Sequence, residues 1–568
     1  MRYHVLACDY DGTLAHDGVV DQSTVQALRR LRESGRRLML VTGRELDDLG
    51  RVFPHLDLFE RVIAENGALL YAPAGRRERL LGEPAPAALV QRLRTAGVAP
   101  LSVGRVIIAA WEPHEAEVLG AIRALGLEHQ VIFNKGAVMV LPAGITKATG
   151  LAAALQEVGL SAHNAVAVGD AENDLHLLAL CECGVAVANA LPSLKKQADW
   201  VTTADHGAGV RELIDKLLAN DLADLTPKLA RHGISLGRTD GAERALAPYG
   251  PNVLLTGASG GGKSTFATAF LERLAERGYQ YCVIDPEGDY STLDCVSFGR
   301  SDQPPDIEQV LKLLHDPREN AVVNLLAITI EDRPRFFARL FAALLDLRTR
   351  SGRPHWIIVD ECHHVLPASL KAAETLLAPG LASVLWITVY PDHVAKPVLA
   401  LIDTVIAVGE APQDALVRIT GALGEPAPAW KQNPLPRGEA LLWLRGGHEP
   451  PVRLETLAPR TERRRHRRKY AKGELPPELS FYFRGPDGKL NLRAQNLSLF
   501  LQSAEGVDDA TWLYHLRRGD YSRWFREVIK DESLAREAGC IERMPDKSAR
   551  ETRKLLRQQI EKRYSAPA

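Results

Sequence analysis

Short apolar runs alternate with amphipathic segments over the first 215 or so residues, which predicts a parallel sheet covered by helices. The strands are expected at His4–Cys8, Arg37–Thr42, Val62–Ala64, Ala165–Val168 and Gly184–Val187. From about Tyr71 to Thr146 the order changes to helix, strand, helix, strand, strand. Its helices are expected at Leu89–Thr95 and Glu115–Leu125, and its strands at Gly104–Trp111, Gln130–Phe133 and Ala137–Leu141. The pattern predicts an α/β domain over residues 1–218 with a small α+β insertion over 71–146.

A second alternation of strands and helices begins at Val253 and continues to about Pro459. We therefore expect a second α/β domain over residues 251–459, joined to the first by a connector over 219–250. A basic linker over 460–476 contains the run Arg463–Lys469, RRRHRRK, and precedes a mainly helical domain over 477–568. The fold class predicted is α/β, a Rossmann-like domain followed by a RecA-like domain.

Composition limits the classes of protein that the chain can belong to, but it does not identify a function. The 568 residues are 46% hydrophobic and 25% charged with a net charge of -1, which argues against a general nucleic-acid coat. The seven cysteines lack the paired spacing of a zinc site. The chain shows neither a secretory leader nor an apolar run of the roughly 18 residues that a membrane helix needs. We expect a cytoplasmic protein with no membrane partner.

Four motifs lie at strand ends of the first domain. Asp9-Tyr10-Asp11-Gly12-Thr13 follows the first strand, Thr42-Gly43-Arg44 follows the second, and Gly169–Asp174 follows a later one, while Lys147 opens a helix. Paired carboxylates at a strand end can share one Mg²⁺, and one of them can attack phosphorus while the other moves a proton. The set predicts a magnesium-dependent phosphoryl-transfer site.

These motifs, in this order, resemble the haloacid dehalogenase superfamily, and the insertion preceded by Glu65-Asn66-Gly67-Ala68 resembles a type IIB cap. The resemblance implies that Asp9 is the nucleophile and Asp11 the general acid/base. It implies that Thr42 and Lys147 are catalytic residues that hold the phosphate. The other implied phosphate-binding residues are Gly43, Arg44 and Asn173, and the implied metal ligands are Asp9, Asp11, Asp170 and Asp174.

The resemblance further implies a small phosphorylated substrate chosen by the cap, such as phosphoglycolate, a sugar phosphate or a phosphoglycerate. The cap sequence does not choose among these compounds. Arg105 and His114 are candidate substrate contacts, although a surface role is the favoured interpretation for both.

The segment 257–264, GASGGGKS, matches the phosphate-binding loop GxxxxGK[ST] between an expected strand, Val253–Leu255, and a helix-forming run. Backbone N–H groups at such a loop bind phosphates, the lysine reaches the terminal ones, and the serine binds Mg²⁺. The predicted ATP-binding residues are Gly257, Gly260, Gly261, Gly262, Lys263, Ser264, Thr265 and Asp360, with Ser264 also a metal ligand. Glu361, after the apolar strand that ends in Asp360, is predicted to polarise the attacking water.

The segment Ile284–Tyr290 and the segment Pro436–Ala440 resemble the HerA/FtsK superfamily of ring ATPases. That resemblance implies a homo-oligomer, with a ring hexamer as one form, and an arginine supplied in trans. Arg418 and Arg437 are candidates for this arginine, although an ordinary salt bridge is the favoured role for either. Tyr390 stands where this superfamily commonly has a glutamine sensor, so nucleotide binding is the safer expectation than translocation.

Three functional hypotheses remain open. The first is a bifunctional enzyme, a small-molecule phosphatase fused to a HerA-like ATPase. The second is a nucleic-acid machine whose phosphatase processes nucleotide or polynucleotide phosphates, and the third is a scaffold that binds ATP with little turnover. The aromatic and basic stretch Trp512–Trp524 is compatible with base stacking, but an apolar core with solvated arginines is favoured.

Overall fold

A computed structural model describes residues 1–134, 136–258, 260–290, 293–370, 377, 380–430, 435–447, 449–460, 475, 479–486, 488, 490–529 and 531–564. The chain divides into two compact units, Met1–Pro459 and Arg460–Ala568. Most of the predicted basic linker, including Arg463–Lys469, lies outside the described residues. Within the described part, no helix combines the length and apolar character needed to cross a bilayer.

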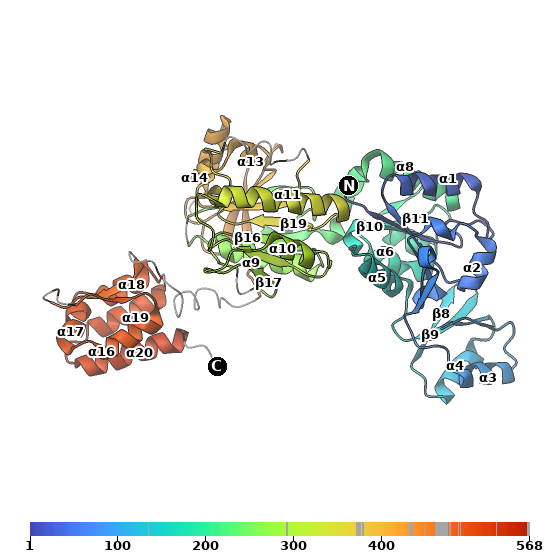
Figure 1. Cartoon of the computed structure of the whole chain (residues 1–568), viewed down its shortest axis with the longest axis horizontal. Helices are drawn as coiled ribbons and strands as arrows, with labels where there is room; N and C mark the ends of the chain where they lie inside the picture. The colour runs from blue at the N-terminus through green and yellow to red at the C-terminus, as the bar shows by residue number, and fades with distance from the viewer. Residues whose placement is uncertain are drawn as a thin grey trace. The chain divides into compact units, whose positions relative to one another are not determined.

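The first domain is built on an eight-stranded sheet in the order β12-β11-β10-β1-β2-β3-β4-β5. Its central strands are parallel, and three of them, β1 (Val5–Asp9), β2 (Arg37–Val41) and β10 (Ala165–Gly169), are almost fully buried. Figure 1 labels β10 within this sheet. Helices such as α1 (Gln22–Glu33), α5 (Lys147–Glu157) and α8 (His206–Asn220) cover the sheet because their apolar faces pack on these strands. The parallel strands end at a common edge.

The remaining strands of this sheet are β3 (Arg61–Ala64), β4 (Leu69–Ala72), β5 (Arg77–Leu80), β11 (Cys183–Ala186) and β12 (Trp200–Val201). The inserted cap has its own four-stranded sheet, in the order β6-β7-β9-β8. Its elements are β6 (Ser102–Val103), α3 (Ala87–Thr95), β7 (Ile108–Trp111), α4 (Glu115–Ala124), β8 (His129–Asn134) and β9 (Ala137–Pro142). The helix–strand order matches the expectation, and β6 is an additional short strand.

In the described part of the chain, the second sheet has eleven strands in the order β14-β13-β23-β22-β21-β15-β20-β19-β16-β18-β17. Its strands include β22 (Glu439–Leu444), β18 (Ala321–Asn324) and β17 (Val296–Phe298). Its parallel part contains β15 (Val253–Thr256), β16 (Tyr281–Asp285), β19 (Trp356–Val359), β20 (Val384–Thr388) and β21 (Thr404–Val408). Residues 219–250, assigned above to a connector, include the hairpin β13 (Ile234–Thr239) and β14 (Ala242–Leu246), which pairs with β23 (Val452–Thr456). The hairpin escaped the sequence analysis because its second strand is exposed and polar.

The unit Arg460–Ala568 is mainly helical, as predicted, with one short hairpin of β24 (Phe481–Phe483) and β25 (Leu492–Ala494). Its helices include α16 (Leu497–Gly506), α17 (Asp509–Arg517), α18 (Asp520–Glu527), α19 (Glu532–Glu542) and α20 (Ala549–Tyr564). The aromatic side chains of the stretch 481–525 form its core, with Phe500, Trp512 and Tyr521 almost fully buried. The favoured interpretation of this stretch as an apolar core agrees with this packing.

Candidate active sites

Three carboxylates meet at the edge of the first sheet. Asp9 ends β1 and Asp170 follows β10, and because these neighbouring strands are parallel, both side chains emerge at the same edge. Asp174 lies in the short turn that follows Asp170. Oxygen atoms of the three side chains lie within 4.8 Å of one another, and all three residues are buried. A cluster of hard oxygen donors with this spacing fits a divalent cation such as Mg²⁺.

Lys147 lies inside this carboxylate cluster. Its Nζ is 2.5 Å from Oδ1 of Asp9 and 2.6 Å from Oδ1 of Asp174, and only 2% of the residue is exposed. The side chain of Thr146 accepts from the backbone N–H of Thr149 and caps the helix that Lys147 begins. Burial raises the pKa of Asp9 well above its ordinary value, and the Asp174 carboxylate adds to this, whereas Lys147 lowers it. A positive charge beside Asp9 therefore favours its ionised form.

The turn that carries Asp174 is held by its own side chain. Oδ2 of Asp174 accepts from the backbone N–H groups of Asp170 and Ala171, at 3.0 and 3.1 Å. A Cβ at Gly169 would lie 2.6 Å from the Asp174 side chain, so glycine is required there. Thr13 donates its hydroxyl to Oδ1 of Asp170 at 3.2 Å. The sequence signal for Thr13 was present in its motif, but its contact with Asp170 was not anticipated.

Arg44, a predicted phosphate-binding residue, pairs here with carboxylates. Its Nε and Nη2 donate to the two oxygens of Asp11 at 2.8 and 2.7 Å, and Nη1 donates to Asp48 at 2.7 Å. The backbone N–H of Arg44 donates to Oγ1 of Thr42, which is fully buried. A Cβ at Gly43 would lie 3.7 Å from the sulfur of Met139, so the cap sheet approaches the phosphate loop closely.

The other predicted residues of this domain fall into two groups. Asn173 donates from its side chain to Oδ1 of Asn66 at 3.1 Å, which ties the carboxylate edge to the turn after β3. Arg105 pairs with Asp47 and Glu78, and the ring of His114 contacts the backbone of Ala99. These contacts support the favoured surface role of Arg105 and His114.

The second site lies where β15 enters α9 (Lys263–Glu276). Gly257 has φ +144°, and a Cβ there would lie 2.1 Å from the carbonyl oxygen of Val408, so only glycine fits. Nζ of Lys263 donates to the carbonyl oxygens of Gly257 and Ala258, at 2.9 and 3.3 Å. Gly260, Gly261 and Gly262 complete the loop, and Ser264 and Thr265 follow Lys263 in the first turn of the helix.

Asp360 and Glu361 follow β19. In the sheet, β20 lies between β19 and β15, the strand that leads into the glycine-rich loop. Burial raises the pKa of Asp360 well above its ordinary value, and the nearby Asp285 carboxylate adds to this. Burial also raises the pKa of Glu361, whereas Lys263 lowers it. Burial in turn lowers the pKa of Lys263, and the charges of Glu361 and Asp360 oppose this lowering.

His363 is a site residue that the sequence analysis missed. Its Nδ1 lies 3.4 Å from Oε2 of Glu361 and 3.0 Å from Oγ1 of Thr388. Tyr390 is 45% exposed and packs edge-on against His363. His363, two residues after Glu361, therefore links Glu361 to the end of β20 through polar contacts. No sequence motif recognised above includes this histidine.

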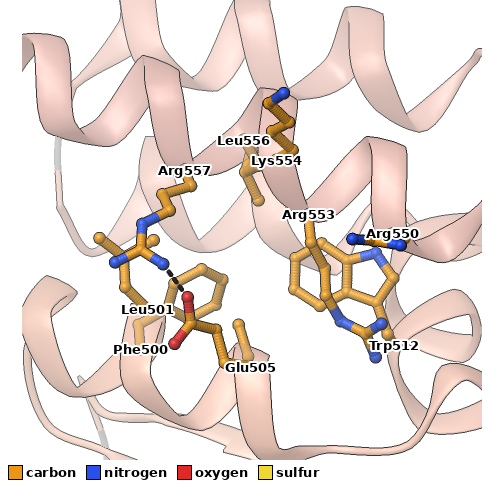
Figure 2. A pocket seen from close by; sticks show the side chains of 10 residues that line it. Phe500, Leu501, Glu505, Trp512, Arg550, Arg553, Lys554, Leu556 and Arg557 are labelled. Carbon is orange, nitrogen blue, oxygen red and sulfur yellow. Dashed lines mark ion pairs between the residues drawn. The ribbon is translucent and has the colours of Figure 1, made fainter.

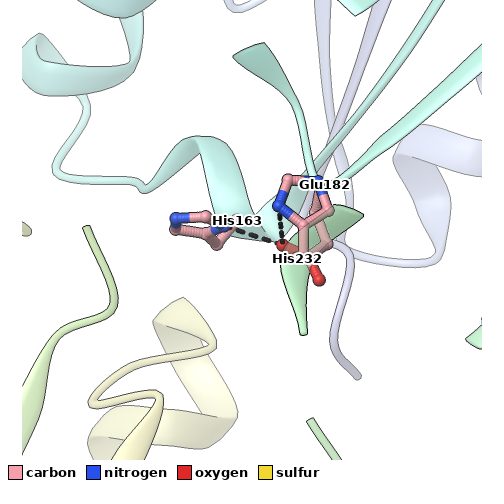
Figure 3. Close-up of side chains that lie close together, drawn as sticks. All are labelled: His163, Glu182 and His232. Atoms are coloured by element: carbon pink, nitrogen blue, oxygen red, sulfur yellow. Dashed lines mark hydrogen bonds and ion pairs between the residues drawn. The ribbon is translucent and has the colours of Figure 1, made fainter. Parts of the chain in front are cut away.

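A buried polar cluster joins the two α/β domains. Glu182 accepts from Tyr279 at 2.8 Å and pairs with Arg2. Its carboxylate lies 2.7 Å from Nδ1 of His163, as Figure 3 shows, and Nε2 of His163 is 2.6 Å from the carbonyl oxygen of Arg277. Burial would raise the pKa of Glu182, but the hydrogen bond from His163 and the charge of Arg2 lower it to about 2. His232 also approaches this carboxylate, at 3.8 Å. Since Arg2, Tyr279 and His163 already neutralise and satisfy Glu182, the cluster acts as a structural joint.

A pocket of about 360 Å³ lies between α16, α17 and α20 of the C-terminal unit (Figure 2). Four cationic side chains of α20 line it, together with Glu505 and a floor that includes Trp512, and the four are Arg550, Arg553, Lys554 and Arg557. Arg557 pairs with Glu505, and Arg553 lies over the Trp512 ring. The pocket combines positive charge with an aromatic side chain, Trp512.

Comparison with known proteins gives two family matches. A model described as haloacid dehalogenase-like hydrolase matches residues 6–90 and 113–214, and one described as AAA ATPase domain matches residues 239–387. A phosphoglycolate phosphatase of Pyrobaculum islandicum is 30% identical over 229 residues, which cover 39% of this chain and 98% of that protein. One of Natronomonas pharaonis is 32% identical over 224 residues, covering 38% and 98%.

A solved structure, a haloacid dehalogenase-like hydrolase from Bacteroides thetaiotaomicron, aligns with 38% of this chain and 99% of its own. The TM-score is 0.34 and the sequence identity is 20%.

Proposed function

Since the chain belongs, through its first domain, to the haloacid dehalogenase-like hydrolase family, we propose that it hydrolyses a small phosphomonoester through an aspartyl-phosphate. The observation that carries this proposal is the position of Lys147, whose ammonium group bridges Asp9 and Asp174 beside Asp170. This edge offers an anionic nucleophile, a fixed cation and a cluster of oxygen donors. Those are the groups that transfer of an anionic phosphoryl group requires.

In the proposed reaction, a carboxylate oxygen of Asp9 forms a bond to phosphorus while the bond from phosphorus to the ester oxygen breaks. Asp11 gives a proton to the departing alkoxide. A water molecule then attacks the phosphorus of the acyl phosphate, Asp11 takes its proton, and Asp9 is released with inorganic phosphate. Lys147 stabilises the negative charge that moves through both steps, and Thr42 and the Gly43 backbone hold the phosphoryl oxygens.

Asp9, Asp170 and Asp174 would hold Mg²⁺, with the backbone of Asp11, and the ion would supply charge neutralisation at the phosphate. Asn173 would support the ion and the phosphate from the same turn. We infer that Arg44 exchanges Asp11 for the substrate phosphate, because a guanidinium that donates twice to Asp11 holds it as a carboxylate. Release of Arg44 leaves Asp11 able to carry the proton that the leaving group needs.

We propose phosphoglycolate or a sugar phosphate as the substrate class. The two relatives described above are phosphoglycolate phosphatases, and each aligns over 98% of its length with the first domain. Met139 and Ile107 of the cap lie in one buried apolar cluster, and Met139 approaches the phosphate loop at Gly43.

For the second domain we propose ATP binding and hydrolysis, with a HerA-like mode of assembly. Gly257, Gly260, Gly261, Gly262 and Thr265 would bind the phosphates, Lys263 would reach the terminal one, and Ser264 and Asp360 would hold its Mg²⁺. Glu361 would polarise the attacking water. An arginine from a neighbouring copy, Arg418 or Arg437, would complete the site in a ring.

A second candidate function, action on nucleic acid, is favoured by one observation. The segment 460–568 contains 25 Lys and Arg against 16 Asp and Glu, a net charge of +9 in a chain whose total is -1. Such a segment would attract a polyanion. ATP hydrolysis stimulated by DNA or RNA, with a steep salt dependence, would establish this candidate, and hydrolysis indifferent to nucleic acid would remove it.

The proposed phosphatase is tested with a panel of phosphoglycolate, sugar phosphates, nucleotides and end-phosphorylated oligonucleotides. We expect phosphate release from a small metabolite to be lost in Asp9→Asn and retained in Lys263→Ala. Release by Asp9→Asn at the unaltered rate would refute the aspartyl-phosphate route.

A further inference from the structure

The turn Glu65-Asn66-Gly67 contacts a loop of the cap and three segments of the first domain that carry site residues, those of Thr42, Lys147 and Asn173. It follows β3 and has positive φ at each of its residues, +52°, +54° and +108°. Left-handed backbone at two non-glycine residues is uncommon and costs free energy, on the order of 1–3 kcal/mol at each position. Such strain persists only where surrounding contacts fix it, so the contacts of this turn indicate its role.

The side chain of Glu65 holds a loop of the cap. It is fully buried and accepts three consecutive backbone N–H groups, from Arg105 at 2.8 Å, Val106 at 2.8 Å and Ile107 at 2.9 Å. A Cβ at Gly104 would lie 2.7 Å from the carboxyl carbon of Glu65, so the loop reaches this depth only with glycine there. Three bonds to one carboxylate are charge-assisted and strong.

The same turn fixes the catalytic loops of the core. Its backbone N–H groups donate to the carbonyl oxygens of Arg44 and Thr42, both at 2.9 Å. The side chain of Asn66 accepts from Asn173 at 3.1 Å. A Cβ at Gly67 would lie 2.0 Å from the carbonyl oxygen of Thr146, just before Lys147. The loop after β2, the segment before α5 and the turn that carries Asn173 therefore all contact Glu65, Asn66 or Gly67.

The loop that Glu65 holds also contributes to a buried apolar cluster. Val106 and Ile107 pack with Ala68, Met139 and Leu141 in one buried cluster, and Met139 reaches the phosphate loop at Gly43. We propose that Glu65 is a positioning residue that holds the cap loop 105–107 in place relative to Thr42, Lys147 and Asn173. The inference rests on the proposed phosphatase function. It assigns to Glu65, through the cap loop that it holds, a role in substrate capture.

The test is Glu65→Gln in the full-length chain. Glutamine keeps the shape but turns an NH₂ group toward backbone donors, so at least one N–H loses its acceptor. We expect kcat/KM for phosphoglycolate to fall about tenfold or more, mainly through KM. We expect amide hydrogen exchange at residues 105–107 to accelerate by a similar factor. ATP hydrolysis by the second domain should keep its rate, which reports that the chain is folded.

Glu78→Gln is the matched control, because Glu78 is an exposed partner of Arg105 in the same loop. It should change kcat/KM less than twofold. If Glu65→Gln does not fold, Gly104→Ala displaces the loop while Glu65 stays in place, and the same kinetic loss is expected.

A lower melting temperature with unchanged KM, kcat and exchange at 105–107 would overturn the positioning role. The failure of the proposed function itself looks different. In that case the unaltered chain releases no phosphate from any phosphomonoester, while the change in amide exchange still reports whether Glu65 holds the cap.

Discussion

The Nζ of Lys147 lies 2.5 Å from Oδ1 of Asp9, although 138 residues and the whole cap separate them in sequence. The contact exists because Asp9 ends a central strand and Lys147 begins the helix that packs beside that edge. Burial lowers the pKa of Lys147, but the carboxylates of Asp174 and Asp9 outweigh it and raise the pKa overall. The lysine is consequently a fixed positive charge.

Lys147→Met tests this charge. Methionine fills a similar volume but leaves Asp9 and Asp174 as neighbouring buried carboxylates, and breaking a buried ion pair costs about 3–5 kcal/mol. We expect phosphate release to fall by a factor of about 10² or more. Added Mg²⁺ should recover part of the lost melting temperature because the ion would replace the missing charge. Lys195→Met, on the surface helix α7 (Pro192–Gln197), is the control. Equal stability with and without Mg²⁺ would contradict the proposed shared metal site.

Arg44→Ala distinguishes two roles for this guanidinium. If Arg44 moves from Asp11 to the substrate phosphate, the variant should raise KM by about 10–100-fold, as expected for a lost charge-assisted contact. If Arg44 only holds Asp11, KM should stay the same and kcat should change. Arg51→Ala is a matched control, since Arg51 is 75% exposed and pairs with Asp48 as Arg44 does. Steady-state kinetics on the best substrate of the panel give the answer.

Much of the first domain was predictable because its strands and motifs are continuous in sequence. The α/β fold class is confirmed, as is the resemblance of the first domain to a haloacid dehalogenase-like hydrolase. The predicted P-loop domain matches a model of an AAA ATPase domain, a group that the sequence analysis did not name. The narrower resemblance to HerA/FtsK and the catalytic roles stay predictions. Asp9, Asp170 and Asp174 were foreseen as neighbours because the ends of parallel strands converge on one edge.

The features that escaped prediction depend on contacts between distant residues. Arg44 can pair with the Asp11 carboxylate or with a substrate phosphate, and the spacing of the motifs does not indicate which of the two it contacts. His363 carries no pattern, since a histidine near an acidic strand end is common. The joint around Glu182 gathers Arg2, His163 and Tyr279 from three segments, and only the docking of the two domains brings them together.

The stability of the unit Met1–Pro459 should decline as the pH falls below about 6.5. Burial lowers the pKa of His4 and of His232 from 6.5 to about 4, because the charged imidazolium is disfavoured. In the unfolded chain these groups take up protons between pH 6.5 and 4, whereas in the folded chain they do not. The free energy of unfolding should therefore fall within this window by about 1.4 kcal/mol per pH unit for each histidine. Below about pH 4 these two contributions level off.

Chemical denaturation across pH 4 to 8 measures this slope. His232→Gln should reduce the slope of the unfolding free energy against pH by the contribution of one histidine. His16→Gln, which replaces an exposed histidine of the same domain, should leave the slope unchanged. A slope that His232→Gln does not alter would show that His232 is already protonated in the folded chain.

Arg353 should make the two α/β domains unfold together. It is fully buried and donates to the carbonyl oxygens of Gly159 in the first domain and Leu314 in the second, at 2.5 and 2.9 Å. Burial lowers its pKa to about 10, which leaves it charged at neutral pH. Arg353→Ala should remove about 2–5 kcal/mol and split one calorimetric transition into two. Arg350→Ala, exposed on α11 (Arg333–Ser351), should keep a single transition. Two transitions already present in the unaltered chain would contradict the coupling.

The last prediction separates ATP binding from ATP turnover. In Glu361→Gln the amide keeps the shape of the side chain but cannot accept a proton from water, so ATP should bind and persist. Stabilisation by ligand follows RT ln(1 + [L]/Kd), which is about 2.7 kcal/mol at a hundredfold excess over Kd, so ATP should raise the melting temperature of this variant. In Lys263→Ala the same addition should have little effect, because the terminal phosphate loses its cation. His363 lies 3.4 Å from Glu361 and 3.0 Å from Thr388, so His363→Ala should slow turnover while ATP still stabilises the chain. ATP turnover in Glu361→Gln equal to that of the unaltered chain would mean that another group activates the water, and His363 would then be the first residue to test in that role.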